Sequence, residues 1–99
     1  VYYSPSNNSA RFSVITSKSM ATMFKNNLVS NLGMNNRGVK SAGFYVIKRN
    51  TVPAVLIELG FLSGSSDYSK LTSQTFQKNS AKVIYDTINQ LFETYPTGR

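Results

Sequence analysis

The sequence contains neither cysteine nor histidine. Without cysteine, the chain can form no disulfide and offers no thiolate to a metal ion. Without histidine, its serines lack the imidazole base that commonly activates a serine nucleophile. No stretch approaches the roughly 20 apolar residues of a membrane-spanning helix, so we expect no membrane span. Within these 99 residues, catalysis by a cysteine or by a serine–histidine pair is therefore excluded.

Acidic residues are also scarce, with four Asp and Glu against eleven Lys and Arg, for a net charge of +7. Glu58 is the first acidic residue in the chain. A basic first half usually indicates an anionic partner, which leaves a nucleic acid, an anionic cell-wall polymer and mere solubility open. Glycoside hydrolysis usually needs two flanking carboxylates, and only Glu58 is well placed, which argues against a glycosidase. The seven cations that precede Glu58 are Arg11, Lys18, Lys25, Arg37, Lys40, Lys48 and Arg49.

The apolar pattern predicts one α/β domain segment over residues 1–99, with the element order β-α-β-β-α. A first helix follows from the four-residue spacing of Met20, Phe24, Leu28 and Leu32, with Gly33 as its C′ residue. Ser9 and Ser13 are the candidate N-caps of this helix. Lys18 and Lys25 are seven residues apart, so we expect both on its solvent face. The other predicted elements are strands at residues 1–3, 44–47 and 54–59, a loop at 60–67, and a helix from about Ser73 to Tyr95.

Glu58 is the most conspicuous residue for chemistry. It lies in an apolar run that begins after Pro53 and ends before Gly60, which is typical of a strand buried on both faces. An ionised carboxylate is rarely buried without a partner or a task, so Glu58 is a candidate catalytic group. The alternative is a salt bridge from Glu58 to Arg37 or Lys40.

Three segments together resemble a known family. They are Val52-Pro53-Ala54-Val55-Leu56-Ile57-Glu58-Leu59-Gly60-Phe61-Leu62-Ser63, Asn36-Arg37-Gly38-Val39-Lys40 with Phe44-Tyr45-Val46-Ile47, and Val1-Tyr2-Tyr3-Ser4. In this order they resemble the zinc-dependent N-acetylmuramoyl-L-alanine amidases of the Amidase_3 type, which are peptidoglycan hydrolases. The resemblance covers essentially the whole chain. It implies a three-layer α/β/α fold and makes Glu58 the glutamate that acts on the metal-bound water.

The same resemblance implies that the metal ligands lie elsewhere. In the family, two histidines and a glutamate in the N-terminal half of the domain hold the zinc. This chain therefore resembles the C-terminal half of the catalytic domain, and we expect the zinc-binding half upstream of it. Zinc is then a cofactor of the complete domain, with no ligand from this chain, and we expect the isolated chain to be inactive.

Arg37 and Lys40 are the candidate substrate-binding residues. They lie in one glycine-containing turn, and a guanidinium and an ammonium can both hold the carboxylates of a peptidoglycan stem peptide. The alternatives are a solvated basic loop, or Arg37 connecting two loops. We expect peptidoglycan as the substrate, a secreted or cell-wall-associated protein, and possible contact with anionic wall polymer.

Two other functional classes stay open. The first is a cell-wall binding module that has lost catalysis. The second is a basic nucleic-acid-binding domain, which we do not favour. Base-stacking sheets interleave aromatic residues with Lys and Arg, whereas here Phe24, Phe76 and Phe92 fall on predicted helical core stripes.

Overall fold

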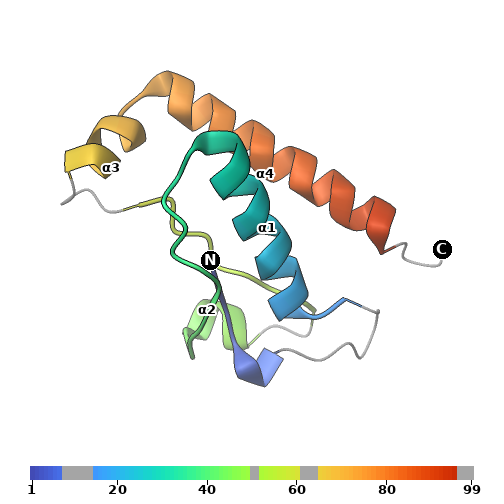
Figure 1. The fold of residues 1–99 in the computed structure, drawn as a ribbon. Helices are drawn as coiled ribbons and strands as arrows, with labels where there is room; N and C mark the ends of the chain where they lie inside the picture. Colours follow the sequence, from blue (N-terminus) through green and yellow to red (C-terminus); the bar gives the residue numbers. More distant parts are fainter. Residues whose placement is uncertain (8–14, 50–51, 61–64, 96–99) are drawn as a thin grey trace.

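The computed structural model describes residues 1–7, 15–49, 52–60 and 65–95. Figure 1 shows two long helices that cross, with one short helix beside the start of the C-terminal long helix (orange to red) and another (light green) below the N-terminus. None of the helices in the described ranges is long and apolar enough to span a membrane. The elements in chain order are β1 (Tyr2–Tyr3), a 3₁₀ turn (Pro5–Asn7), α1 (Ser17–Leu32), β2 (Lys40–Ser41), α2 (Tyr45–Lys48), α3 (Ser65–Leu71) and α4 (Gln74–Thr94).

The sheet is built around β1. This strand pairs in parallel with β2, in a register that places Tyr2 opposite Lys40 and Tyr3 opposite Ser41. On its other side, Tyr2 forms an antiparallel bridge with Leu56, in which each backbone N–H donates to the other residue's carbonyl, at 2.8 and 2.9 Å. Since β1 and β2 are separated by the helix α1, this parallel pair has the β-α-β connection of α/β proteins.

Local capping fixes both ends of α1. The Thr16 hydroxyl accepts a hydrogen bond from the Ser19 backbone N–H at 3.2 Å, and the Ser19 hydroxyl accepts one from the Thr16 N–H at 3.1 Å. This reciprocal pair is a capping box. The predicted end at Gly33 is confirmed, because Gly33 has a φ of 62° in the left-handed region. The predicted N-caps, Ser9 and Ser13, lie outside the described residues, and Thr16 is the cap.

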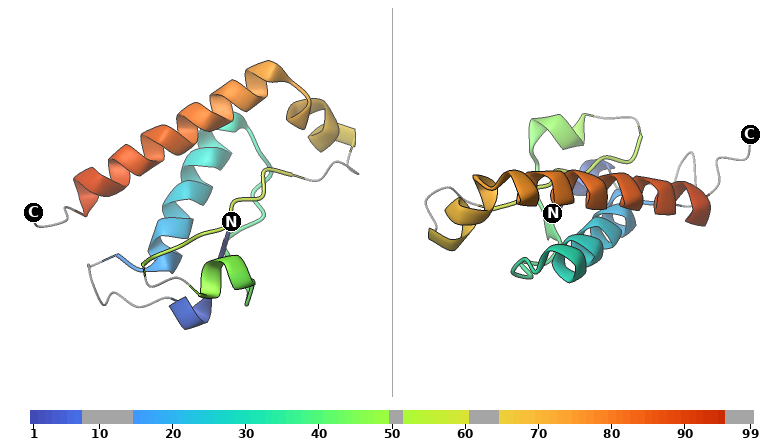
Figure 2. Two further views of the ribbon diagram at one scale, coloured as in Figure 1. Left: turned by 180° about the vertical axis from the view of Figure 1, so that it is seen from behind. Right: turned by 90° about the horizontal axis from the view of Figure 1, so that it is seen from above.

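The core lies where α4 crosses α1, and both views of Figure 2 show α4 lying across that helix. Phe24 and Leu28 of α1 pack with Leu91 of α4, and all three are buried. The helix predicted from Ser73 to Tyr95 is confirmed, because these two residues are the caps of α4. Burial of this apolar cluster stabilises the packing of the two helices.

Two of the predicted strands are wrong. Residues 44–47 fall at the start of the short helix α2, in which Ile47 is buried while Tyr45 and Val46 are 72% and 64% exposed. A run of aromatic and β-branched residues favours a strand only where a sheet accepts it, since β propensity depends on context. Residues 54–59 form no regular strand, and they pair with β1 only through Leu56.

Two further expectations are wrong. The loop predicted at 60–67 contains the start of α3. Phe92 of α4, which the sequence predicts on a helical core stripe, is 61% exposed. Ile84 and Tyr95 pack against the core cluster, whereas Ile88 and Phe92 are exposed. The start of α3 and the exposure of part of α4 could not be predicted from neighbouring residues in the sequence, because both depend on which other segments pack there.

Candidate active site

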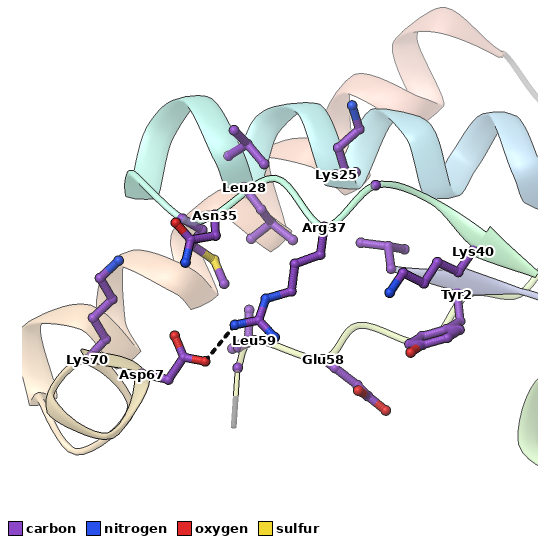
Figure 3. A pocket seen from close by; sticks show the side chains of 15 residues that line it. Tyr2, Lys25, Leu28, Asn35, Arg37, Lys40, Glu58, Leu59, Asp67 and Lys70 are labelled. Carbon is purple, nitrogen blue, oxygen red and sulfur yellow. Dashed lines mark hydrogen bonds and ion pairs between the residues drawn. The ribbon is translucent and has the colours of Figure 1, made fainter. Parts of the chain in front are cut away.

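Six charged side chains line one cavity of about 90 Å³. Its walls come from α1, the segment 34–40, β1, residues 58–60 and α3. Figure 3 shows side chains from these segments facing the cavity. All three residues singled out from the sequence line it, and so do three more charged residues. The charged lining consists of Lys25, Arg37, Lys40, Glu58, Asp67 and Lys70.

Glu58 lines this cavity and lies two residues after the Leu56 bridge to β1. The expectation that it is buried is wrong for this chain, because Glu58 is exposed. The physical reason is that, within the described part of the chain, residues 54–59 have a pairing partner only in β1. Among the residues described, no hydrogen bond or ion pair to another side chain is found for its carboxylate. In Figure 3 the carboxylate points away from the Arg37–Asp67 pair.

The electrostatic field of Glu58 reaches the first residue of the chain. The pKa of the Val1 α-amino group is lowered, chiefly because burial disfavours its charged form. The Glu58 carboxylate opposes this lowering of the pKa, and the Lys40 ammonium adds to it. Glu58 and Lys40 therefore act on the same end of β1, which forms one wall of the cavity.

Arg37 is paired across the cavity with Asp67. Its Nη2 lies 3.0 Å from Asp67 Oδ2, and Asp67 stands in the first turn of α3. The pair connects the segment before β2 to α3, which is the connecting role that the sequence left open for Arg37. Close by, the Gly38 N–H donates to Asn36 Oδ1 at 3.0 Å, and Gly38 has a φ of 75°. This turn, which needs glycine, sets the direction from which Arg37 enters.

The other cations reach the cavity from three different elements. Lys40 comes from β2, where its register opposite Tyr2 places it near Glu58's end of the site. Lys25 comes from α1 and is half-buried, so the expectation of a solvent-facing side chain is wrong for Lys25. Lys70 of α3 donates its Nζ to the Gly33 carbonyl at 3.3 Å, which neutralises the C-terminal end of α1.

Sequence reasoning missed Lys25, Lys70 and Asp67 as lining residues. A signal existed for Lys25, because it precedes Leu28 by three residues and so borders the apolar stripe of α1. No comparable signal existed for Asp67 and Lys70, since α3 itself was not predicted. Their positions depend on contacts between segments about thirty residues apart, such as Arg37 with Asp67.

The residues present do not fit a zinc site. The full sequence has no histidine or cysteine. Among the described residues, no three of the remaining ligand types, Asp and Glu, gather where they could hold a metal ion. A catalytic zinc usually takes three protein ligands, which this chain does not bring together.

Comparison with known proteins gives one consistent result. The model of the family described as N-acetylmuramoyl-L-alanine amidase, Amidase_3, matches residues 1–90. The chain is 40% identical over 75 residues to N-acetylmuramoyl-L-alanine amidase LytC of Bacillus subtilis (strain 168), which covers 76% of the chain and 15% of that protein. It is also 40% identical over 77 residues to the uncharacterized protein YqiI of the same organism, covering 78% of the chain and 37% of that protein.

A solved structure supports the same relationship. The fold is similar to N-acetylmuramoyl-L-alanine amidase AmiC2 of Nostoc punctiforme, with a TM-score of 0.78 and 27% identity. The similarity covers 93% of this chain and 46% of that one. The predicted α/β class is thereby confirmed. The chain spans less than half the length of each of these three relatives.

Proposed function

Because the chain belongs to the Amidase_3 family of N-acetylmuramoyl-L-alanine amidases, we propose that it is part of the catalytic domain of a peptidoglycan hydrolase. The bond cleaved is the amide between the N-acetylmuramoyl lactyl group and L-alanine. One observation carries the proposal beyond family membership. Glu58, in the segment that resembles the family signature, lines the same charged cavity as Arg37 and Lys40.

Glu58 is the general base in this proposal. Its carboxylate accepts a proton from the water that attacks the amide carbonyl carbon. The new bond joins the water oxygen to that carbon, and the carbon–nitrogen bond then breaks. Glu58 returns the proton to the leaving nitrogen of L-alanine, so that the carboxylate is regenerated. An exposed carboxylate with no described side-chain partner is accessible to both the water and the substrate.

Arg37 and Lys40 are the substrate-binding residues in this proposal. Each can hold a carboxylate of the stem peptide, the guanidinium by a fork of two hydrogen bonds and the ammonium as a point charge. Their placement supports this role, because both side chains reach the cavity from one short segment that ends in β2. In Figure 3 both project over the segment that carries Glu58 and Leu59.

Zinc belongs to the complete domain in this proposal, and its ligands come from outside this chain. We expect the isolated 99-residue chain to bind zinc weakly or not at all, because it has no histidine or cysteine. Metal analysis after dialysis against a chelator measures this directly. Retention of about one tightly bound zinc ion per chain would contradict the expectation, since a retained ion needs about three protein ligands.

The basic residues before Glu58 support action at the cell wall, outside the cytoplasm. Lys18 of α1 and Lys48 of α2 are exposed, and we expect them to contribute to binding anionic wall polymer. The double variant Lys18→Glu, Lys48→Glu should co-sediment less with intact walls at low salt. The difference should disappear in high salt, because exposed charges are screened over about 8 Å already at physiological ionic strength.

Lys78→Glu is the control for this prediction. Lys78 is exposed on α4 and lies in the half of the chain that carries all four acidic residues. The Lys78→Glu substitution should leave wall binding nearly unchanged. A loss in the control of about half that of the double variant, in proportion to the charge changed, would show that only net charge matters. Binding that responds to neither salt nor substitution would rule out the wall-polymer contact.

Solubilisation of purified peptidoglycan by the complete enzyme separates catalysis from the alternative of a binding module. The proposal predicts that stem peptides appear in the supernatant over time. A protein that co-sediments with peptidoglycan and releases nothing would be a wall-binding module, and the catalytic proposal would then fail.

A further inference from the structure

The Arg37–Asp67 ion pair crosses the cavity and is unevenly buried. The side chain of Asp67 is 14% exposed, whereas that of Arg37 is 46% exposed. We propose that Asp67 is a positioning residue that holds the Arg37 guanidinium in place to bind a substrate carboxylate. This inference rests on the proposed function, since Arg37 must first be a substrate-binding residue.

Asp67 is well placed to act as the fixed partner. It belongs to α3, and α3 is attached to α1 through the hydrogen bond from Lys70 Nζ to the Gly33 carbonyl. A short carboxylate on a helix has few rotamers, whereas the long arginine side chain has many. Contact with Asp67 therefore removes conformational freedom from Arg37 before the substrate arrives, which lowers the entropic cost of binding.

Gly60 leaves space for the Asp67 carboxylate. A Cβ at residue 60 would lie 2.9 Å from Asp67 Cγ and 3.0 Å from Asp67 Oδ2, which is closer than real Cβ contacts. Gly60 also has a φ of 151°, a conformation that residues with side chains rarely adopt. Two residues after Glu58, the chain thus requires glycine both for its backbone and for the position of Asp67.

The side chains that line the cavity have a net positive charge even after this ion pair is counted as neutral. Arg37 and Asp67 neutralise each other, but Lys25, Lys40 and Lys70 remain against Glu58 alone. A guanidinium presents a planar fork of five N–H donors, so it can contact an anion beside Asp67. The ligand class that fits is therefore a peptide with a free carboxylate, held by Arg37 and the neighbouring Lys40.

The test uses the complete enzyme and two soluble muramoyl peptides, one with a free carboxylate on its stem peptide and one with that group amidated. For the peptide with the free carboxylate, Asp67→Asn should raise KM roughly fivefold, which is the size of effect expected when a partly exposed ion pair is lost. The kcat should stay within about twofold, because Asp67 does not touch the reacting bond. For the amidated peptide, KM should not change.

A double-mutant cycle tests whether Asp67 acts through Arg37. In an Arg37→Ala background, Asp67→Asn should have no further effect on KM, because nothing remains to be positioned. Gly60→Ala should raise KM in the same direction as Asp67→Asn, since it displaces the carboxylate without removing it. Asp86→Asn is the control, because it removes a different ion pair, the one between Lys82 and Asp86 on α4 at 2.7 Å. This variant should leave both KM and kcat unchanged.

Three results would overturn the inference. They are an unchanged KM in Asp67→Asn, an equal effect of that substitution on both peptides, and an effect that persists in full without Arg37. A wild-type enzyme that does not cleave either peptide would instead overturn the proposed function. Melting temperatures of all variants identify any loss that comes from unfolding, and Gly60→Ala keeps the test open if Asp67→Asn does not fold.

Discussion

Replacing Glu58 with glutamine in the complete enzyme is expected to lower kcat by roughly 100-fold or more, the usual contribution of a positioned proton acceptor. The amide is nearly the same size as the carboxylate but cannot take a proton from water. Since Glu58 is exposed and has no described side-chain partner, the substitution should leave the fold intact. Initial rates on peptidoglycan, with the melting temperature of each protein, measure both effects.

Glu93→Gln is the matched control for this experiment. Glu93 is an exposed glutamate on α4 and does not line the cavity. The control removes the same charge from the chain and should keep the parent rate. If Glu58→Gln hydrolysed peptidoglycan at nearly the parent rate, Glu58 would not be the base, and the site would have to be assigned again.

Phe24→Ala is expected to lower the free energy of unfolding of the chain by about 3–5 kcal/mol. Phe24 is 5% exposed and packs with Leu28 and Leu91 where α1 and α4 cross, so its removal leaves a cavity in the centre of a small core. Urea unfolding of the 99-residue chain, followed by circular dichroism, gives this free energy.

Tyr85→Ala provides the comparison for the core substitution. Tyr85 is also a large aromatic residue on a helix, but it is 64% exposed. Its removal should change the free energy of unfolding by no more than about 0.5 kcal/mol. Equal losses from the two substitutions would show that the crossing of α1 and α4 is not the core of this chain.

The long helices were predictable because their signals are local. The apolar spacing of α1 and α4 and the αL glycine at Gly33 follow from residues a few positions apart. Ser73, the predicted start of α4, is its N-cap, and its hydroxyl accepts the Phe76 N–H at 3.3 Å. The start of α1 was missed because a threonine and a serine form the capping box, in place of the commoner Ser/Thr with Glu/Gln.

The strands were less predictable because sheet pairing is not local. Residues 54–59 have the composition of a buried strand, yet a strand forms only where a neighbouring segment pairs along it. Among the residues that the structure describes, this segment forms only the Leu56 bridge to Tyr2. The same missing neighbour explains why Glu58 is exposed and not buried. Apolar composition predicted an extended segment, but it could not predict how much of that segment pairs within this chain.

The main residues of the candidate site could be predicted from the sequence, but their contacts with other segments could not. Glu58, Arg37 and Lys40 were identified by charge and motif, and the structure brings all three to one cavity. The Asp67 partner of Arg37 lies thirty residues away on an unpredicted helix, so no local pattern indicated it. The roles of these residues stay predictions, which the substitutions described above test one by one.

The identity of the cleaved bond tests the central claim most directly. Purified peptidoglycan is digested with the complete enzyme, and the products are identified by mass spectrometry. The account predicts stem peptides with a free N-terminal L-alanine, together with glycan strands that have lost their peptides and carry no new reducing ends. Disaccharide–peptide fragments with new reducing ends, and no free alanine amino group, would contradict it and indicate cleavage of the glycan.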